Sequence, residues 1–200
     1  MDRACVNVFS LDELLINIFI RFKNDNILRN KKSSEYLWQN EIYSYFKKCT
    51  TKQTTIKPEE VVKNSRIDFV IEFELAKKEW GIEIYLSNVT NFGDNDKKHV
   101  ERFFSNEGDY ADLIENEKKC CIICICPNSY ENKEKEKFLV EGLNSYLSKM
   151  NEKCIEKFYK NFLFYIIHLN YSCLNSNSYY TVKKTELKKN KKFCSFFKIF

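Results

Sequence analysis

Two acidic residues, Asp68 and Glu83, lie in separate apolar segments that have the alternating pattern of β-strands. Asp68 belongs to residues 66–73 and Glu83 to residues 80–86, and in both segments apolar residues recur at every second position around the acid. Side chains alternate between the two faces of a strand, so both acids are expected to leave the apolar layer on the same side if the strands pair. Two such carboxylates can hold a divalent cation, which phosphodiester hydrolysis needs.

The short connection between these segments predicts a β-hairpin, and the position of its turn sets the register. A turn centred between residues 76 and 77 places Asp68 opposite Tyr85, with Glu83 as a diagonal neighbour roughly 7–8 Å away at the Cα. A turn centred one position earlier places the two acids directly opposite each other. Either register lets both carboxylates reach one ion, and without a cation or a basic neighbour the acids would repel each other.

A third acid, Glu41, lies on a predicted helix over residues 35–48, with Ser34 at the N-cap position. Its spacing from Trp38 and Tyr45 draws it toward the apolar stripe of that helix. A carboxylate in that place is costly unless it is paired or binds a metal ion. It can equally extend along the edge of the stripe into solvent, and both interpretations stay open.

Basic residues gather on the next predicted helix, over residues 96–105. Lys98 and Arg102 are four positions apart, and His99 and Arg102 are three apart, so either pair shares a helix face. His99 is a candidate for proton transfer or for phosphate contact. A single histidine beside an apolar stripe is also typical of a structural or surface residue.

The remaining pattern predicts an α/β fold with a mixed central sheet flanked by helices. Helices are expected over residues 10–22, 35–48, 96–105 and 132–150, and strands over residues 54–62, 66–74, 79–87, 120–126 and 161–169. Pro58 makes the first of these strands an edge strand or a bent one.

Composition narrows the class of protein. The chain has 200 residues, 44% of them hydrophobic, with a formal net charge of +5. The mild positive charge suits an anionic partner, and it equally describes a solvated surface. Nine cysteines are present, and four of them lie in the apolar strand 120–126, where free cysteine behaves as a small hydrophobic residue. We therefore expect a reduced, intracellular protein of the cytoplasm or nucleus, with no signal peptide and no membrane span.

Three parts are expected along the chain: an N-terminal helical extension over residues 1–33, a domain over residues 34–170, and a basic tail over residues 171–200. The lysine-rich residues 183–192 suggest a nuclear-import patch or a nucleic-acid contact. A solvated, frayed terminus is the favoured interpretation.

Five segments in order resemble the PD-(D/E)xK restriction-endonuclease-like superfamily and, more narrowly, the nuclease domains of Crinkler-type proteins of fungi and oomycetes. They are residues 39–43, 66–69, 80–83, 98–103 and 108–110. The resemblance covers about residues 35–128 and implies a restriction-endonuclease-like αβββαβ core.

That resemblance implies that Asp68 and Glu83 hold Mg²⁺ or Mn²⁺, and that Glu41 assists. In the superfamily a lysine follows two positions after the second acid, and here that position is Tyr85. The phenol of tyrosine is uncharged at neutral pH and cannot stabilise charge as an ammonium does. A substitute is expected among Lys98, His99 and Arg102, which complete the set of candidate catalytic residues.

Three functions remain open from the sequence. The first is a metal-dependent nuclease that cuts phosphodiester bonds, with DNA held mainly through phosphate contacts. The second is a catalytically impaired relative that binds nucleic acid or a protein partner through the same fold. The third is a structural or interaction domain, in which the acids are ordinary surface charges of the hairpin.

Overall fold

The computed structural model describes residues 11–25, 34–50, 53–62, 65–74, 77–87, 93–104, 108–110, 112, 113, 116, 118–126, 137, 141, 142, 144, 145, 148, 162–169, 180–188, 192, 193, 197 and 198. The elements in chain order are α1 (Leu11–Asp25), α2 (Glu35–Cys49), β1 (Thr54–Val62), β2 (Ser65–Phe73), β3 (Lys78–Leu86), α3 (Asp94–Phe104), β4 (Lys119–Cys126), β5 (Phe162–Leu169), β6 (Tyr180–Lys188), β7 (Lys192–Phe193) and β8 (Phe197–Lys198).

The strands form one mixed sheet in the order β1-β2-β3-β4-β5-β6-β7, with β8 paired to β6. The pairs β1–β2 and β2–β3 are antiparallel, the pairs β3–β4 and β4–β5 are parallel, and β6 is antiparallel to β5. The predicted α/β class with a mixed central sheet and flanking helices is confirmed. The succession α2-β1-β2-β3-α3-β4 is also consistent with a restriction-endonuclease-like αβββαβ core.

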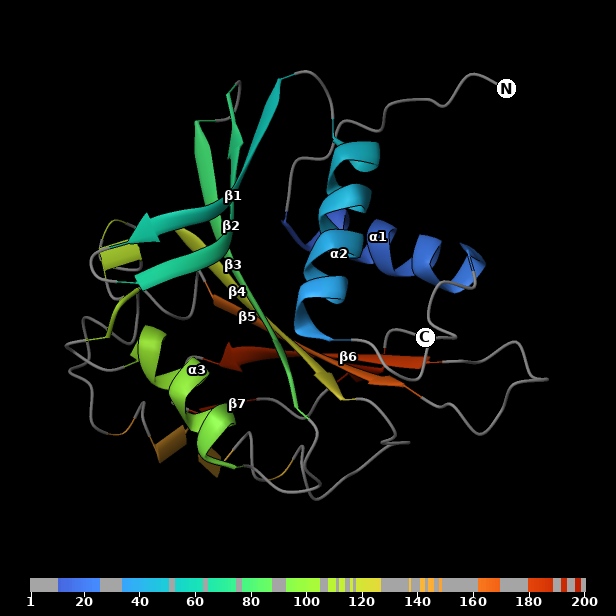
Figure 1. The fold of residues 1–200 in the computed structure, drawn as a ribbon. Coiled ribbons are helices and arrows are strands. Elements are labelled where there is room, and N and C mark those ends of the chain that lie inside the picture. Colours follow the sequence, from blue (N-terminus) through green and yellow to red (C-terminus); the bar gives the residue numbers. More distant parts are fainter. Residues whose placement is uncertain are drawn as a thin grey trace.

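Helices cover both faces of the sheet (Figure 1), with α1 and α2 on one face and α3 on the other. Each face has its own hydrophobic core. Alternate residues of the central strand β4 supply both: Cys121, Ile123 and Ile125 pack with α1 and α2, and Cys120, Ile122, Cys124 and Cys126 pack on the α3 side. A strand that is buried on both faces needs an almost continuous apolar run, which is what 120–126 provides.

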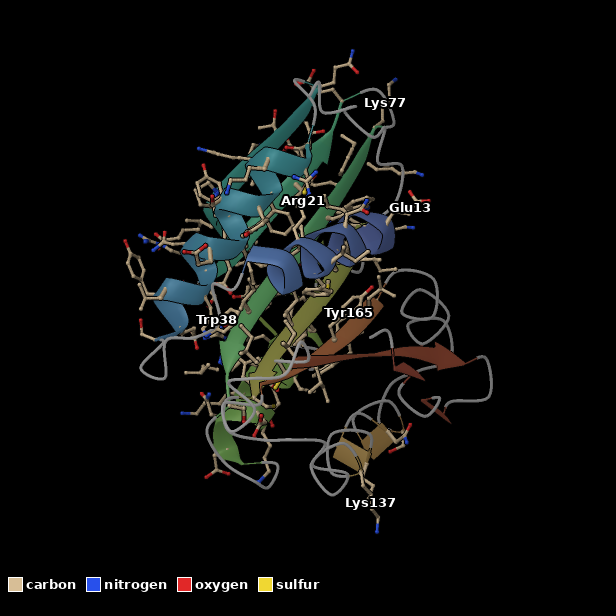
Figure 2. All side chains as sticks on the ribbon, turned by 90° about the vertical axis from the view of Figure 1, so that its right-hand side faces the viewer. Glu13, Arg21, Trp38, Lys77, Lys137 and Tyr165 are labelled. Atoms are coloured by element: carbon tan, nitrogen blue, oxygen red, sulfur yellow. The ribbon has the colours of Figure 1, made fainter. Side chains whose placement is uncertain are left out.

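The core on the side of α1 and α2 joins α1 to the sheet. Phe19 of α1 packs on Tyr165 of β5, with ring centroids 5.5 Å apart, and Figure 2 shows Tyr165 on the sheet beside this helix. The cysteines of β4 are buried and free of disulfides, so they serve as small apolar residues, as the sequence predicts. In the described part of the chain, no helix is both long and apolar enough to cross a membrane.

Of two segments in the C-terminal half of the chain, one lies mostly outside the described residues and the other does not match the element expected from the sequence. The helix expected over 132–150 falls mostly outside the described residues. The segment 171–200, expected as a basic tail, contributes β6, which pairs with β5 over seven residues from Leu163↔Glu186 to Leu169↔Tyr180. A frayed terminus is therefore the wrong description of Tyr180–Lys188, because its backbone continues the sheet.

β1 and β2 bend together part-way along their length (Figure 1). Their ladder pairs Pro58 with Phe69 and Glu60 with Ile67, and Glu59 between them has a φ of 51°. Phe69 packs in the core under α2, whereas Ile67 packs in the core on the α3 side. Strict alternation predicts both on one face, and that prediction is wrong for Ile67 because the strand turns at the residue between them.

Candidate functional site

The hairpin of β2 and β3 brings the two predicted acids together. Its last backbone pair is Phe69↔Ile82, and one further step in this register sets Asp68 opposite Glu83. This is the second of the two registers that the sequence allows, with the turn centred between residues 75 and 76. Beyond Phe69 the strands separate, so side chains rather than a backbone ladder fill the space between them.

Asp68 is held from two directions. Gln39 of α2 donates from Nε2 to Oδ1 at 2.9 Å, and the backbone N–H of Ile84 donates to Oδ2 at 2.5 Å. The Asp68 carboxylate thus reaches across to the backbone of β3. It occupies the place where backbone pairing between β2 and β3 would continue if the ladder did not end at Phe69. It lies at the junction between α2 and the sheet.

The pKa of Asp68 is raised from 3.8 to about 8. Burial is the largest cause, the negative charge of Glu83 is the second, and Glu35 adds to both. The Ile84 amide and the Arg102 guanidinium act in the opposite direction because they favour the carboxylate. Without a further cation, Asp68 therefore keeps its proton at neutral pH.

Along this part of β3, backbone N–H groups donate to side-chain carboxylates instead of to a neighbouring strand. Glu35 of α2 accepts a hydrogen bond at Oε2 from the N–H of Leu86 at 3.2 Å, just as Asp68 accepts from Ile84. These two amides point the same way from β3, toward the side that β2 has left. Ser34 caps α2 by accepting from Leu37 N at 3.4 Å, as expected, and this fixes where Glu35 begins the helix.

Glu83 lies on the α3 side and is 2% exposed. Oε1 is 2.8 Å from Nδ1 of His99 and also accepts from the guanidinium of Arg102, while Oε2 accepts from the hydroxyl of Tyr110 at 3.1 Å. A buried carboxylate is stable only when it is paired and hydrogen-bonded, and these three side chains meet that need. Burial, followed by the charge of Glu83, raises the pKa of Tyr110, so its phenol stays neutral and donates.

Tyr85, two positions after Glu83, is fully buried beneath α3. Its ring stacks on the imidazole of His99 with centroids 4.5 Å apart and planes 7° from parallel. Burial holds the pKa of Tyr85 well above its usual range, so it carries no charge. Its contribution is to hold His99 against Glu83, and the positive charge beside the acids comes from Arg102.

Tyr110 reaches Glu83 because the chain after α3 turns back closely over that helix. The N–H of Tyr110 donates to the carbonyl of Arg102 at 2.8 Å. A Cβ atom at Gly108 would lie 2.4 Å from the same carbonyl oxygen, so only glycine fits there. The Tyr110 hydroxyl also contacts the carbonyl of Arg66 on β2, which ties this turn to both β2 and β3.

The predicted site residues thus fall into two groups. Asp68, Glu83, His99 and Arg102 lie together, whereas Lys98 is exposed on α3. Glu41 is half-buried on α2, two positions beyond Gln39 and therefore on a different face of the helix. The roles assigned to all six residues stay predictions.

Sequence reasoning did not single out Glu35, Gln39 or the role of Tyr110. Glu35 and Gln39 are four positions apart, so they share a helix face, and that spacing is the one local signal that could have found them. Tyr110 lies far along the chain from both acids, and its role depends on how the turn after α3 folds back.

Two carboxylates are a donor set that suits a hard cation. Mg²⁺ binds oxygen, commonly uses one or two carboxylates and keeps several waters. Burial is the main cause of the raised pKa of Asp68, and a cation here would offset the second cause, the negative charge of Glu83. Asp68 and Glu83 are therefore of the right chemical type for Mg²⁺ or Mn²⁺, although each of their oxygens already has a hydrogen-bond partner, and ion binding by them stays a prediction. In the described part of the chain, no group of three or more His, Cys, Asp or Glu side chains is arranged to hold a metal ion, so water or substrate oxygens would have to complete its coordination.

Comparison with known proteins adds little to this geometry. No family model matches the chain, and no curated protein does. Among solved structures, the chain is similar to SfsA of Pyrococcus furiosus in complex with Ca²⁺, with 14% identity and a TM-score of 0.32 over 76% of this chain and 60% of that one. The chain thus spans less than two thirds of that protein, and a likeness at this level carries no functional weight. The resemblance to Crinkler-type domains stays a prediction.

Proposed function

We propose that this protein is a metal-dependent nuclease that hydrolyses phosphodiester bonds, with DNA as its substrate. The observation that carries the proposal is that β2 and β3 set Asp68 opposite Glu83, in a place where burial first and the charge of Glu83 second raise the pKa of Asp68 to about 8. Such perturbation of a carboxyl beside a second acid is typical of functional sites. A purely structural hairpin would gain nothing from holding two acids together in a buried place.

In this proposal Asp68 and Glu83 hold Mg²⁺ or Mn²⁺ through carboxylate oxygens. Bound there, the ion would activate water and offset charge at the scissile phosphate. Ile84 and Gln39 orient Asp68 for this role through the two hydrogen bonds to its carboxylate. The resemblance also implies an auxiliary role for Glu41, which lies on a different face of α2 from Gln39.

Positive charge for the phosphate would come from α3. The side chain of Arg102 is 34% exposed while it contacts Glu83, so it lies between the buried acid and solvent and can meet a phosphate oxygen. His99 has Nδ1 toward Glu83, so any proton exchange with a ligand would use Nε2. Lys98, exposed on the same helix, would add a phosphate contact that weakens with salt.

The buried Tyr85 favours a second candidate function, a module that binds nucleic acid or a protein partner without cutting. The position that normally supplies an ammonium instead carries a neutral ring packed beneath His99. Arg102 is also partly neutralised by Glu83. Loss of the transition-state cation would leave binding intact while turnover falls.

The test is cleavage of labelled plasmid and single-stranded DNA by the purified protein, with Mg²⁺, with Mn²⁺ and with EDTA. We expect cutting that requires metal and is lost in Asp68→Asn and in Glu83→Gln. The matched control is Glu72→Gln, which removes an acid from the same strand β2 where it pairs with Lys57 at 2.5 Å. Glu41→Gln measures the auxiliary role.

The outcomes separate the candidates. Metal-dependent cutting that Glu72→Gln retains and Asp68→Asn loses supports the nuclease. Absence of cutting together with salt-sensitive DNA binding favours the binding module. Absence of both cutting and binding overturns any nucleic-acid function for this site.

A further inference from the structure

The bend of β1 and β2 is centred on one backbone conformation. Regular pairs flank Glu59 and Asp68, and at these two described residues the ladder is interrupted. Glu59 has a φ of 51°, in the left-handed region that residues other than glycine, asparagine and aspartate rarely adopt. The preceding Pro58 has a restricted φ and no N–H to donate, so the ladder is already weak at this point.

The bend changes the direction of β2 for the residues that precede Asp68. The tip of the β1–β2 hairpin folds onto the α3 side of the sheet. There Ile67 and Val62 join the core, and the carbonyl of Arg66 accepts a hydrogen bond from Tyr110. The β2–β3 ladder consequently ends at Phe69. The backbone of β3 beyond that pair then meets side-chain carboxylates, starting with Asp68 at Ile84.

We propose that Glu59 is a positioning residue whose left-handed backbone sets this bend and thereby turns the Asp68 carboxylate across to the Ile84 amide. A straight β2 would continue to pair with β3 and would place the Asp68 side chain on the α3 face of the sheet, opposite Glu83 but out of the sheet plane and away from the Ile84 amide. The importance of this placement for metal binding rests on the proposed function, whereas the placement itself does not.

The backbone of Glu59, and not its charge, carries this role. Its side chain pairs with Arg66 at 3.3 Å, but the two side chains are 69% and 68% exposed. Exposed ion pairs of this kind contribute little, because solvent screens them. Strained residues persist where the surrounding structure holds them, and they concentrate at functional sites.

Substitutions of Glu59 separate the effect of its backbone conformation from the effect of its side-chain charge. Glu59→Gly keeps the left-handed conformation at no steric cost, and Glu59→Gln removes only the charge. Glu59→Val opposes the conformation because a β-branched residue is strongly disfavoured there, and Glu59→Ala opposes it more gently if the valine variant does not fold.

The first readout is hydrogen exchange at the Ile84 amide, with the amides of the β4–β5 ladder as an internal reference. We expect protection at Ile84 to match the wild type in Glu59→Gly and Glu59→Gln, and to fall roughly tenfold or more in Glu59→Val relative to the reference amides. The second readout is Mn²⁺ affinity of the full chain, which should fall in parallel with that protection.

Equal protection of Ile84 in the glycine and valine variants would overturn the inference, as would loss of protection in Glu59→Gln. Should wild-type protein bind no Mn²⁺ and cut no DNA, the proposed function fails, and the exchange measurement alone still decides whether Glu59 positions Asp68. The two proposals therefore fail by different observations.

Discussion

Replacement of Asp68 by asparagine should change how the stability of this protein depends on pH. The pKa of Asp68 is about 8 in the folded protein against 3.8 as its ordinary value, chiefly because the carboxyl is buried and next because Glu83 is charged. A raised acid pKa means that the folded state holds the proton more tightly than the unfolded state. Its stabilising contribution is full below about pH 4 and is lost as the pH rises toward 8.

The size of the effect follows from proton linkage. Between pH 5 and 7 the folded state keeps the Asp68 proton and the unfolded state has released it, so the free energy of unfolding falls by about 1.4 kcal/mol for each pH unit. Over that interval the loss is about 2–3 kcal/mol. The asparagine side chain of the variant does not titrate and can retain both hydrogen bonds if the Gln39 amide turns over, so the variant lacks this loss.

The assay is urea unfolding of the wild type and of Asp68→Asn at several pH values from 5 to 7. We expect the difference in unfolding free energy between them to change by about 2–3 kcal/mol in favour of the variant as the pH rises. Titrating groups that do not interact with Asp68 are common to both proteins and cancel, whereas Glu83, which interacts with it, titrates differently in the variant. A difference that stays constant across this range would refute the argument that burial and Glu83 keep Asp68 protonated. Millimolar Mg²⁺ should reduce the wild-type loss at pH 7 if the site binds the ion.

Three further substitutions test the surroundings of Glu83. Arg102→Met should lower the free energy of unfolding by about 3 kcal/mol, because it leaves a buried carboxylate without its cation; the double variant with Glu83→Gln should recover part of that loss in the same denaturation assay. Tyr110→Phe should cost about 1–3 kcal/mol, since the Glu83 and Arg66 oxygens lose a buried donor, and an unchanged denaturation midpoint would contradict the hydrogen bonds described. Gly108→Ala should cost about 1–3 kcal/mol because its Cβ meets the Arg102 carbonyl, and circular dichroism during heating should show a lower Tm.

Local pattern was enough to predict much of the framework. Alternating apolar residues in 66–73 and 80–86 predict two strands with an acid in each, and both strands form. Helical spacing likewise predicts α2 and α3, and the apolar run 120–126 predicts a strand buried on both faces. These predictions succeed because side-chain periodicity is set by backbone geometry within a few residues.

The composition of the last thirty residues was misleading for the opposite reason. Lysines in 183–192 are typical of a solvated terminus, but Tyr180–Lys188 pairs with β5. Backbone hydrogen bonds form a sheet whatever the side chains, provided that a neighbouring strand leaves its edge open. Composition cannot reveal such an edge.

By itself, the sequence determined which residues could supply carboxylates and cations, and which segments would carry them. Tertiary structure alone decided that Asp68 and Glu83 are opposite each other, that the bend at Glu59 turns Asp68 toward β3, and that Gln39 and Tyr110 complete the hydrogen bonds. Each of these depends on contacts between segments far apart in the chain. No local periodicity encodes such contacts, because they arise only when the two cores pack on opposite faces of one sheet.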